Sequence, residues 1–173
     1  MIESLIQSGE LKWEKLTIKR GEYLIQQGQV ERHFYFVLEG ALRAFAFIGD
    51  EEFTIRFACT NSIVAAIPAY FTRKPSELSI QAIRKCTLLK ISKTEFEAYF
   101  KQSEEKLIAY NDLLKELVAS FYEREIDLLT QSPQERIERI RKRSPQVFQE
   151  IPHKYIASYL RMSPETLSRL LNS

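Results

Sequence analysis

The sequence has few of the residues that metal centres and disulfide frameworks require. Its 173 residues include two cysteines, Cys59 and Cys86, and two histidines, His33 and His153. An iron–sulfur cluster takes about four cysteine ligands, and a cupin-like metalloenzyme takes clustered histidines with a carboxylate. We therefore predict no metal, no cofactor and no enzyme activity, and we rank the metalloenzyme as the weakest alternative. The cysteines form no Cys-x-x-Cys pair, so we expect reduced thiols.

Long hydrophobic runs and a secretory leader are also missing from the sequence. The longest apolar run, residues 63–69, contains a proline and falls far short of the roughly 18 residues of a membrane helix. The N-terminus, Met1-Ile2-Glu3-Ser4, does not have the basic region and the following apolar region of a signal peptide. We therefore expect a cytoplasmic protein without a membrane segment.

Charge is unevenly distributed along the chain. Residues 131–173 contain eight Lys/Arg and four Asp/Glu, which gives +4, whereas residues 1–130 contain 17 Lys/Arg and 19 Asp/Glu, which gives −2. A basic tail behind a near-neutral body favours a module that binds a polyanion. A solvated basic helix face would give the same balance.

The first half of the chain has the pattern of an antiparallel β domain. Residues 1–16 show a helix-like apolar pattern, and from residue 17 short β-branched and aromatic runs alternate with Gly21, Gly28, Gly40 and Gly49 up to residue 91. About eight strands in so short a stretch indicate a small barrel or jelly-roll, which covers strand edges. We predict an α+β protein with a β-roll domain at residues 1–100.

A long helix is expected after the strands. Residues 93–130 lack Gly and Pro, and apolar side chains recur there at spacings of three and four. The stripe comprises Leu107, Tyr110, Leu114, Leu117, Phe121 and Leu128, with Arg124 as its one polar member. Such a heptad pattern favours a dimerisation helix at residues 101–131. An amphipathic helix lying on its own domain is the alternative.

The last segment, residues 132–173, has the signals of several short helices. Ser132-Pro133-Gln134-Glu135 forms a capping box, and Ser163-Pro164-Glu165 starts a second capped helix. A further helix should begin at Pro152, with a turn at Arg161-Met162 before the last one. Two short helices joined by such a turn form a helix-turn-helix.

The segment 156–169, Ile-Ala-Ser-Tyr-Leu-Arg-Met-Ser-Pro-Glu-Thr-Leu-Ser-Arg, resembles the helix-turn-helix of the Crp/Fnr transcription regulators. The resemblance extends over nearly the whole chain, because residues 21–28 and 34–40 are similar to the opening of that family's β-roll of cyclic-nucleotide-binding type. It implies a homodimer that binds pseudo-palindromic DNA, with RNA polymerase as an optional further partner. A departure is Arg161, which stands where the family's turn usually has glycine.

An α-helix fits the major groove, and the residues near its N-terminus reach base edges. Glu165 can accept a hydrogen bond from cytosine and Arg169 can donate two to guanine; the resemblance implies the same base-contacting roles. The full set of predicted DNA-binding residues is Lys154, Tyr155, Arg161, Ser163, Glu165, Thr166, Ser168 and Arg169. An ordinary surface ion pair between Glu165 and Arg169 is the competing interpretation.

The predicted sensor domain lacks the residues that bind cyclic AMP in this family. Where the resemblance implies a Gly-Glu pair and an Arg-Ser or Arg-Ala pair, the sequence has Ala65-Ala66 and Ser76-Glu77. Losing a charge-assisted partner costs about 2–5 kcal/mol, so we expect no response to cyclic AMP. The predicted pocket comprises Ile63, Ala65, Ala66, Tyr70, Ser76, Glu77 and Ile80, and it would accept a small hydrophobic ligand or none. A β-roll regulatory module that does not bind DNA is the alternative function.

Overall fold

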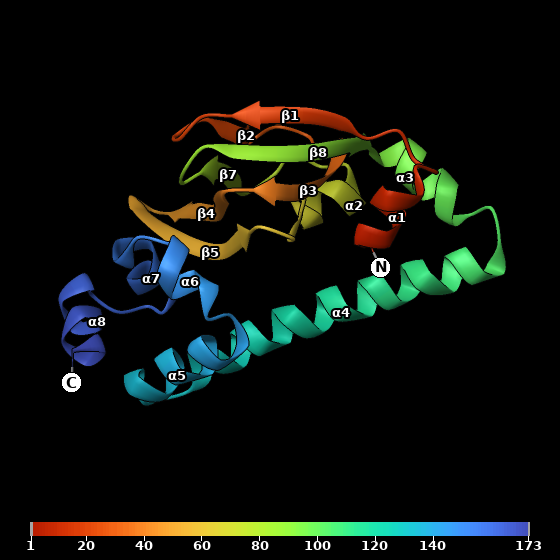
Figure 1. Ribbon diagram of the computed structural model, residues 1–173. Coiled ribbons are helices and arrows are strands. Elements are labelled where there is room, and N and C mark those ends of the chain that lie inside the picture. The colour runs from red at the N-terminus through yellow and green to blue at the C-terminus, as the bar shows by residue number, and fades with distance from the viewer. Residues whose placement is uncertain (1, 173) are drawn as a thin grey trace.

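The computed structural model describes residues 2–172 and confirms the predicted α+β class. Two four-stranded antiparallel sheets form a β-roll above one long helix, and the short C-terminal helices lie at one end of the molecule (Figure 1). The first sheet has the order β1 (Glu14–Ile18), β8 (Cys86–Ser92), β3 (His33–Glu39), β6 (Ile63–Val64). The second has the order β2 (Tyr23–Ile25), β7 (Ser79–Ala82), β4 (Ala41–Ile48), β5 (Glu51–Cys59).

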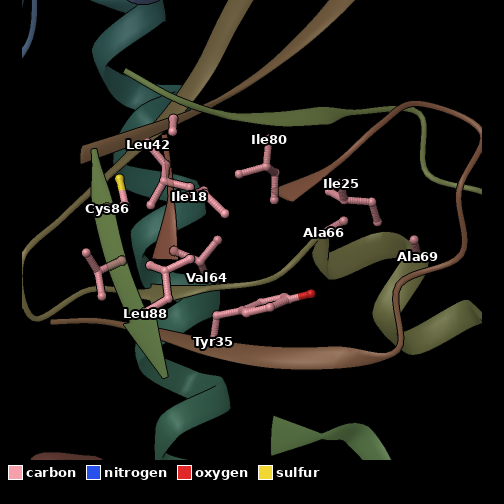
Figure 2. Packing of buried hydrophobic residues seen from close by; sticks show 12 residues of the cluster. Ile18, Ile25, Tyr35, Leu42, Val64, Ala66, Ala69, Ile80, Cys86 and Leu88 are labelled. Carbon is pink, nitrogen blue, oxygen red and sulfur yellow. The ribbon is translucent and has the colours of Figure 1, made fainter. Parts of the chain in front are cut away.

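The two sheets enclose an aliphatic core (Figure 2). Val37, Leu42 and Leu88 are fully buried there, because alternate residues of each strand point to the inner face. Gly40 joins β3 to β4 with φ +106°, and a Cβ at this position would lie 2.5 Å from the carbonyl oxygen of Lys85. The close approach of this turn to the backbone at the start of β8 therefore requires glycine.

A second, aromatic core joins the roll to the surrounding helices. It gathers residues of α1 (Ile2–Ser8), α3 (Lys93–Phe100) and α4 (Glu104–Leu129) against β3. Phe34 stacks on Phe96 with ring centroids 4.2 Å apart, and Tyr110 of α4 stacks on Phe100 at 5.1 Å. The sensor roll and the long helix are thus packed together by aromatic contacts.

The helices differ from the sequence-based expectation at three places. The pattern over residues 1–16 suggests one helix, but α1 ends at Ser8 and β1 begins at Glu14, with the left-handed Gly9 between them. The segment without Gly and Pro breaks at residues 101–103, where the Ser103 hydroxyl accepts the Lys106 N–H and starts α4. Two helices, α2 (Ile67–Thr72) and α6 (Gln146–Glu150), were not expected.

The C-terminal unit contains α5 (Pro133–Arg143), α6, α7 (His153–Tyr159) and α8 (Pro164–Leu171). Both predicted caps are present, since the hydroxyls of Ser132 and Ser163 accept the N–H groups of Glu135 and Thr166. Its core includes Ala41, Cys59 and Ile83 of the roll, so the unit packs on the outer face of the second sheet. None of the helices within residues 2–172 combines the length and hydrophobicity needed to span a bilayer.

Candidate nucleic-acid interface and sensor cavity

The turn between α7 and α8 has a regular hydrogen-bonded form. Met162 donates its N–H to the Ala157 carbonyl at 3.0 Å and Arg161 donates to Ser158 at 3.3 Å, which together make a Schellman motif. Arg161 occupies the left-handed position of the motif with φ +56°. The turn thus keeps the geometry that usually takes glycine, although the residue is arginine.

The outward face of α8 is polar and exposed to solvent. Glu165, Ser168 and Arg169 are exposed, whereas Leu167 on the opposite face is fully buried. Glu165 and Arg169 form no ion pair with each other within the described chain. The backbone N–H of Glu165 and the Ser163 hydroxyl lower the pKa of the Glu165 carboxyl, so this side chain is ionised at neutral pH. The helix therefore offers an acceptor and a cation to solvent.

The predicted contacts on α7 and in the turn lie beside the β4–β5 hairpin. The Arg43 guanidinium lies 4.2 Å from the ring centroid of Tyr155, and that of Arg161 lies 4.0 Å from the centroid of Phe53. Lys154 and Arg161 line a groove shared with this hairpin. The predicted DNA-binding set is therefore split between a free helix face and a face that borders the sensor roll.

Side-chain contacts hold the C-terminal unit on the roll. Thr54 of β5 donates its N–H to the Ser158 hydroxyl at 2.9 Å, and the Arg84 side chain donates to the Glu150 carbonyl. Phe57 of β5 packs against Tyr159 with ring centroids 5.3 Å apart. Any displacement of β5 would consequently act on the orientation of α7 and α8.

The long helix has two apolar faces. One faces the roll and carries Leu113 (buried), with Tyr110 and Leu117 beside it. The other is exposed and carries a stripe comprising Ile108, Val118, Tyr122, Ile126 and Leu129, all at least half exposed. Of the predicted dimer set, Leu107 and Phe121 are exposed, whereas Leu114 and Leu128 are half-buried.

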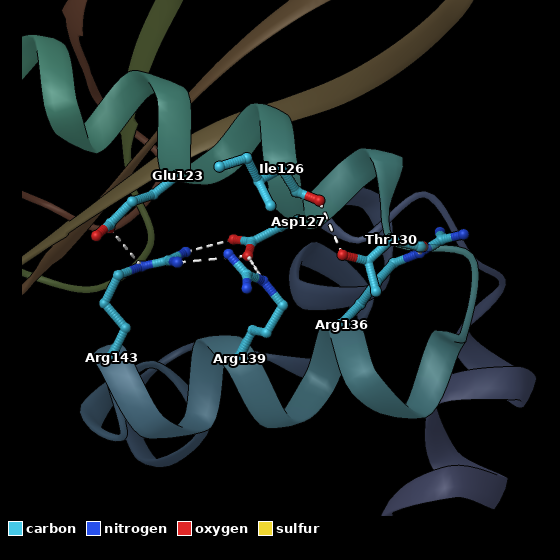
Figure 3. Close-up of polar contacts among 7 residues, drawn as sticks. All are labelled: Glu123, Ile126, Asp127, Thr130, Arg136, Arg139 and Arg143. Carbon is cyan, nitrogen blue, oxygen red and sulfur yellow. Dashed lines mark hydrogen bonds and ion pairs between the residues drawn. The ribbon is translucent and has the colours of Figure 1, made fainter.

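A buried carboxylate connects α4 to α5 (Figure 3). Asp127 has no exposed surface, accepts a hydrogen bond from Arg139 Nε at 2.7 Å and pairs with the Arg143 guanidinium. Glu123, one turn earlier on α4, pairs with Arg143 Nε at 3.2 Å. These ion pairs hold the first helix of the C-terminal unit along the end of the long helix.

A cavity of about 260 Å³ lies between the roll and α4. Three predicted pocket residues, Ile63, Ala65 and Ile80, line it. Tyr70 instead lines a separate apolar cavity with Phe71 of α2.

The other three predicted pocket residues do not line either cavity. Ala66 is buried in the core, and Ser76 Oγ donates to the Leu78 carbonyl at 2.8 Å. The Glu77 side chain is exposed. The segment from Ala65 to Glu77 thus contributes only part of the predicted pocket.

The sequence interpretation missed Arg56 and Phe121, which line the 260 Å³ cavity from β5 and α4. The signal for Arg56 is present in the sequence, because strand alternation places it two residues before the inward-facing Ala58. An arginine at such a position of a β-roll is unusual.

A β-roll, a long apolar-striped helix and an exposed helix-turn-helix define the architecture of a sensor-type regulator. The chain belongs to the cyclic nucleotide-binding domain family, whose model matches residues 15–103, just over half of the sequence. Its fold over nearly the full length is that of the Crp/Fnr regulators, as the sequence resemblance implied. No curated protein sequence matches the chain.

Three solved structures illustrate the similarity. FixK2 from Bradyrhizobium japonicum has a TM-score of 0.78 at 14% identity, with 94% of this chain and 84% of that chain covered. CooA from Carboxydothermus hydrogenoformans gives 0.71 at 16%, covering 98% and 81%. The c-di-GMP responsive regulator CLP from Xanthomonas campestris gives 0.67 at 16%, covering 99% and 88%. At these identities the comparisons establish the fold, and the similar structures are mainly those of transcription regulators.

Proposed function

We propose that the protein is a homodimeric DNA-binding transcription regulator that does not respond to cyclic AMP. The observation that carries the proposal is the free polar face of α8, with Glu165 and Arg169 exposed while Leu167 anchors the helix in the core. A helix with this division of faces can enter a major groove without unfolding. The net charge of +4 in residues 131–173 favours association with phosphates.

The roles within the reading helix follow from chemistry. Arg169 donates to guanine, Glu165 accepts from cytosine, and the hydroxyls of Thr166 and Ser168 contact phosphate or base. In a twofold dimer, two such helices meet half-sites about 34 Å apart. Lys154, Tyr155 and Arg161 border the β4–β5 hairpin, so full use of them on DNA requires the C-terminal unit to move away from the roll.

Arg169→Ala tests the base-reading role. A site is first selected from a random DNA pool, and affinity is then measured by fluorescence anisotropy on that site and on random duplex. We expect the variant to lose about 1–3 kcal/mol on the selected site and to relax the choice at one base position.

The matched control for Arg169→Ala is Arg20→Ala, which removes another exposed arginine, from the sensor roll. This control should leave binding to the selected site unchanged. Equal losses for Arg169→Ala on selected and random DNA would contradict base reading.

A calorimetric titration tests the absence of a cyclic AMP response. At the positions that the resemblance assigns to ribose and phosphate binding, Ala66 has no side-chain acceptor, Ser76 is engaged by Leu78, and Glu77 brings a carboxylate. A phosphate there would meet repulsion rather than a cation. We expect no heat of binding with cyclic AMP or cyclic GMP at micromolar concentrations, and a micromolar dissociation constant for either would refute this part of the proposal.

A further inference from the structure

Arg56 has a guanidinium group that lacks an acceptor. Its Nε and Nη2 atoms are buried without a hydrogen-bond partner, and no carboxylate within residues 2–172 forms an ion pair with it. The ring of Phe121 covers one face of the group at 4.2 Å, which leaves the N–H groups along its edge unsatisfied. Leaving a buried donor unpaired costs free energy, and more so when it is charged. The site therefore favours an incoming oxyanion.

The charges around Arg56 strengthen this preference. Burial lowers the pKa of Arg56, and the nearby cations Arg124 and Arg143 lower it further, whereas Tyr159 and Glu123 raise it. Arg143 is already paired with Asp127 and Glu123. Arg124 donates only a long 3.4 Å hydrogen bond to the Thr54 carbonyl, and its Nε is buried without a partner. Two guanidinium groups here are thus short of acceptors.

Two cavities meet at Arg56. The 260 Å³ cavity extends into the roll, and a second cavity of about 330 Å³ lies between β5, α4, α5 and α7. Arg56, Phe57 and Ser120 line both. The first cavity is lined mainly by apolar side chains, namely Leu42, Ala44, Ala58, Val64, Ile80 and Leu117. Its other arginine, Arg43, is committed to Glu52 and Gln81.

We propose that this junction binds a small amphipathic anion, with its oxyanion group on Arg56 and its apolar body in the cavity of the roll. Medium-chain carboxylates and alkyl phosphates share this chemistry. A guanidinium pairs with either group through two parallel hydrogen bonds. The proposal concerns a site remote from α8 and does not depend on DNA binding.

Calorimetric titration of the full chain, without DNA, tests the proposal. The probes are octanoate, octyl phosphate and the neutral 1-octanol, with acetate as the anion that lacks an apolar body. We expect octanoate or octyl phosphate to bind at least about tenfold more tightly than either 1-octanol or acetate. The reason is that 1-octanol has no anionic group to pair with Arg56, and acetate has no apolar body to fill the cavity. Comparison of octanoate with octyl phosphate identifies the preferred oxyanion.

Arg56→Gln should remove the advantage of the anion over 1-octanol, and Arg20→Gln, at an exposed position of the roll, should not. Circular dichroism establishes that each variant is folded. The comparison among probes in the unaltered protein stands even if Arg56→Gln fails to fold. Equal affinity for octanoate and 1-octanol, an unchanged preference in folded Arg56→Gln, or no binding of the anions at millimolar concentration would overturn the proposal.

Discussion

Arg161 carries a conformational cost that its side chain partly offsets. A φ of +56° costs an L-residue about 1–2 kcal/mol, and stacking of the guanidinium on Phe53 returns about 0.5–1 kcal/mol. Arg161→Gly loses the stacking and relieves the strain, whereas Arg161→Ala loses the stacking and keeps the strain. We expect the glycine variant to be about 1 kcal/mol more stable than the alanine variant in urea unfolding.

A control at Glu116, exposed in the middle of α4, should reverse the sign. Glycine inside a helix is about 1 kcal/mol worse than alanine, so Glu116→Gly should be the less stable of that pair. If the alanine variant at position 161 were as stable as the glycine variant, the turn would not hold this residue in the left-handed conformation.

At the scale of elements, the ion pairs that Asp127 and Glu123 of α4 form with α5 should differ strongly in their contribution to the free energy of unfolding. Asp127 is fully buried and shared by Arg139 and Arg143, so Asp127→Ala removes the carboxylate that pairs with Arg139 and leaves Arg143 paired with Glu123. The side chains of Arg139 and Arg143 are 39% and 28% exposed, so we expect a cost of about 1.5–3 kcal/mol, the range for hydrogen bonds to charged groups. Chemical denaturation should show that loss in the free energy of unfolding.

Glu123→Ala is the matched variant, because Glu123 pairs with the same Arg143 from a half-exposed position. A surface ion pair contributes about 0–1 kcal/mol, so this variant should remain close to the parent. Similar losses for the two substitutions would show that Asp127 does not hold α5 to α4.

Two helix starts that the sequence predicts well are those at which a capping serine is followed by proline. Ser132 and Ser163 are followed by proline, and each starts a helix where its hydroxyl was expected to accept a hydrogen bond. The two unexpected helices, α2 and α6, have six and five residues, and neither has a side-chain cap. Such short helices are stabilised by tertiary packing, so the local sequence does not predict them.

The candidate site was predictable to a similar extent. The hydroxyl and charged residues of α8 follow from the cap and the apolar spacing, whereas the sequence leaves open whether the turn at Arg161 is left-handed, as the structure has it, or reshaped. The sequence does not show which face of α4 contacts the roll, because Tyr110 and Val118 belong to equally apolar stripes and only the position of the roll distinguishes them. The unpaired state of Arg56 depends on neighbours from α4 and α5 that are distant in sequence.

At the scale of the whole molecule, β5 contacts both the proposed ligand site and the proposed DNA-binding unit. Its inner face lines the cavity through Arg56, and its outer face holds α7 through the Thr54–Ser158 hydrogen bond and the Phe57–Tyr159 contact. A ligand that moved Arg56 would therefore act on both α4 and α7. The C-terminal unit is a two-state element in this scheme, and a ligand shifts its populations only by binding one state more tightly.

The exposed stripe of α4 is the surface through which the proposed homodimer would form. Val118, Tyr122, Ile126 and Leu129 are half or more exposed along one side of the helix, and an apolar stripe of this length is unfavourable in water. Val118→Glu together with Ile126→Glu would place four carboxylates in a twofold helix pair. Sedimentation velocity should show a dimer for the parent chain and a monomer for this variant.

Glu116→Lys changes the charge by as much but lies on the other side of α4, and it should remain dimeric. The DNA affinity of the monomeric variant should fall as well, because two reading helices then no longer bind as one unit. A parent chain that is monomeric at micromolar concentration would contradict this arrangement, whereas a dimer that persists in the glutamate variant would mean that the pair is held by another surface.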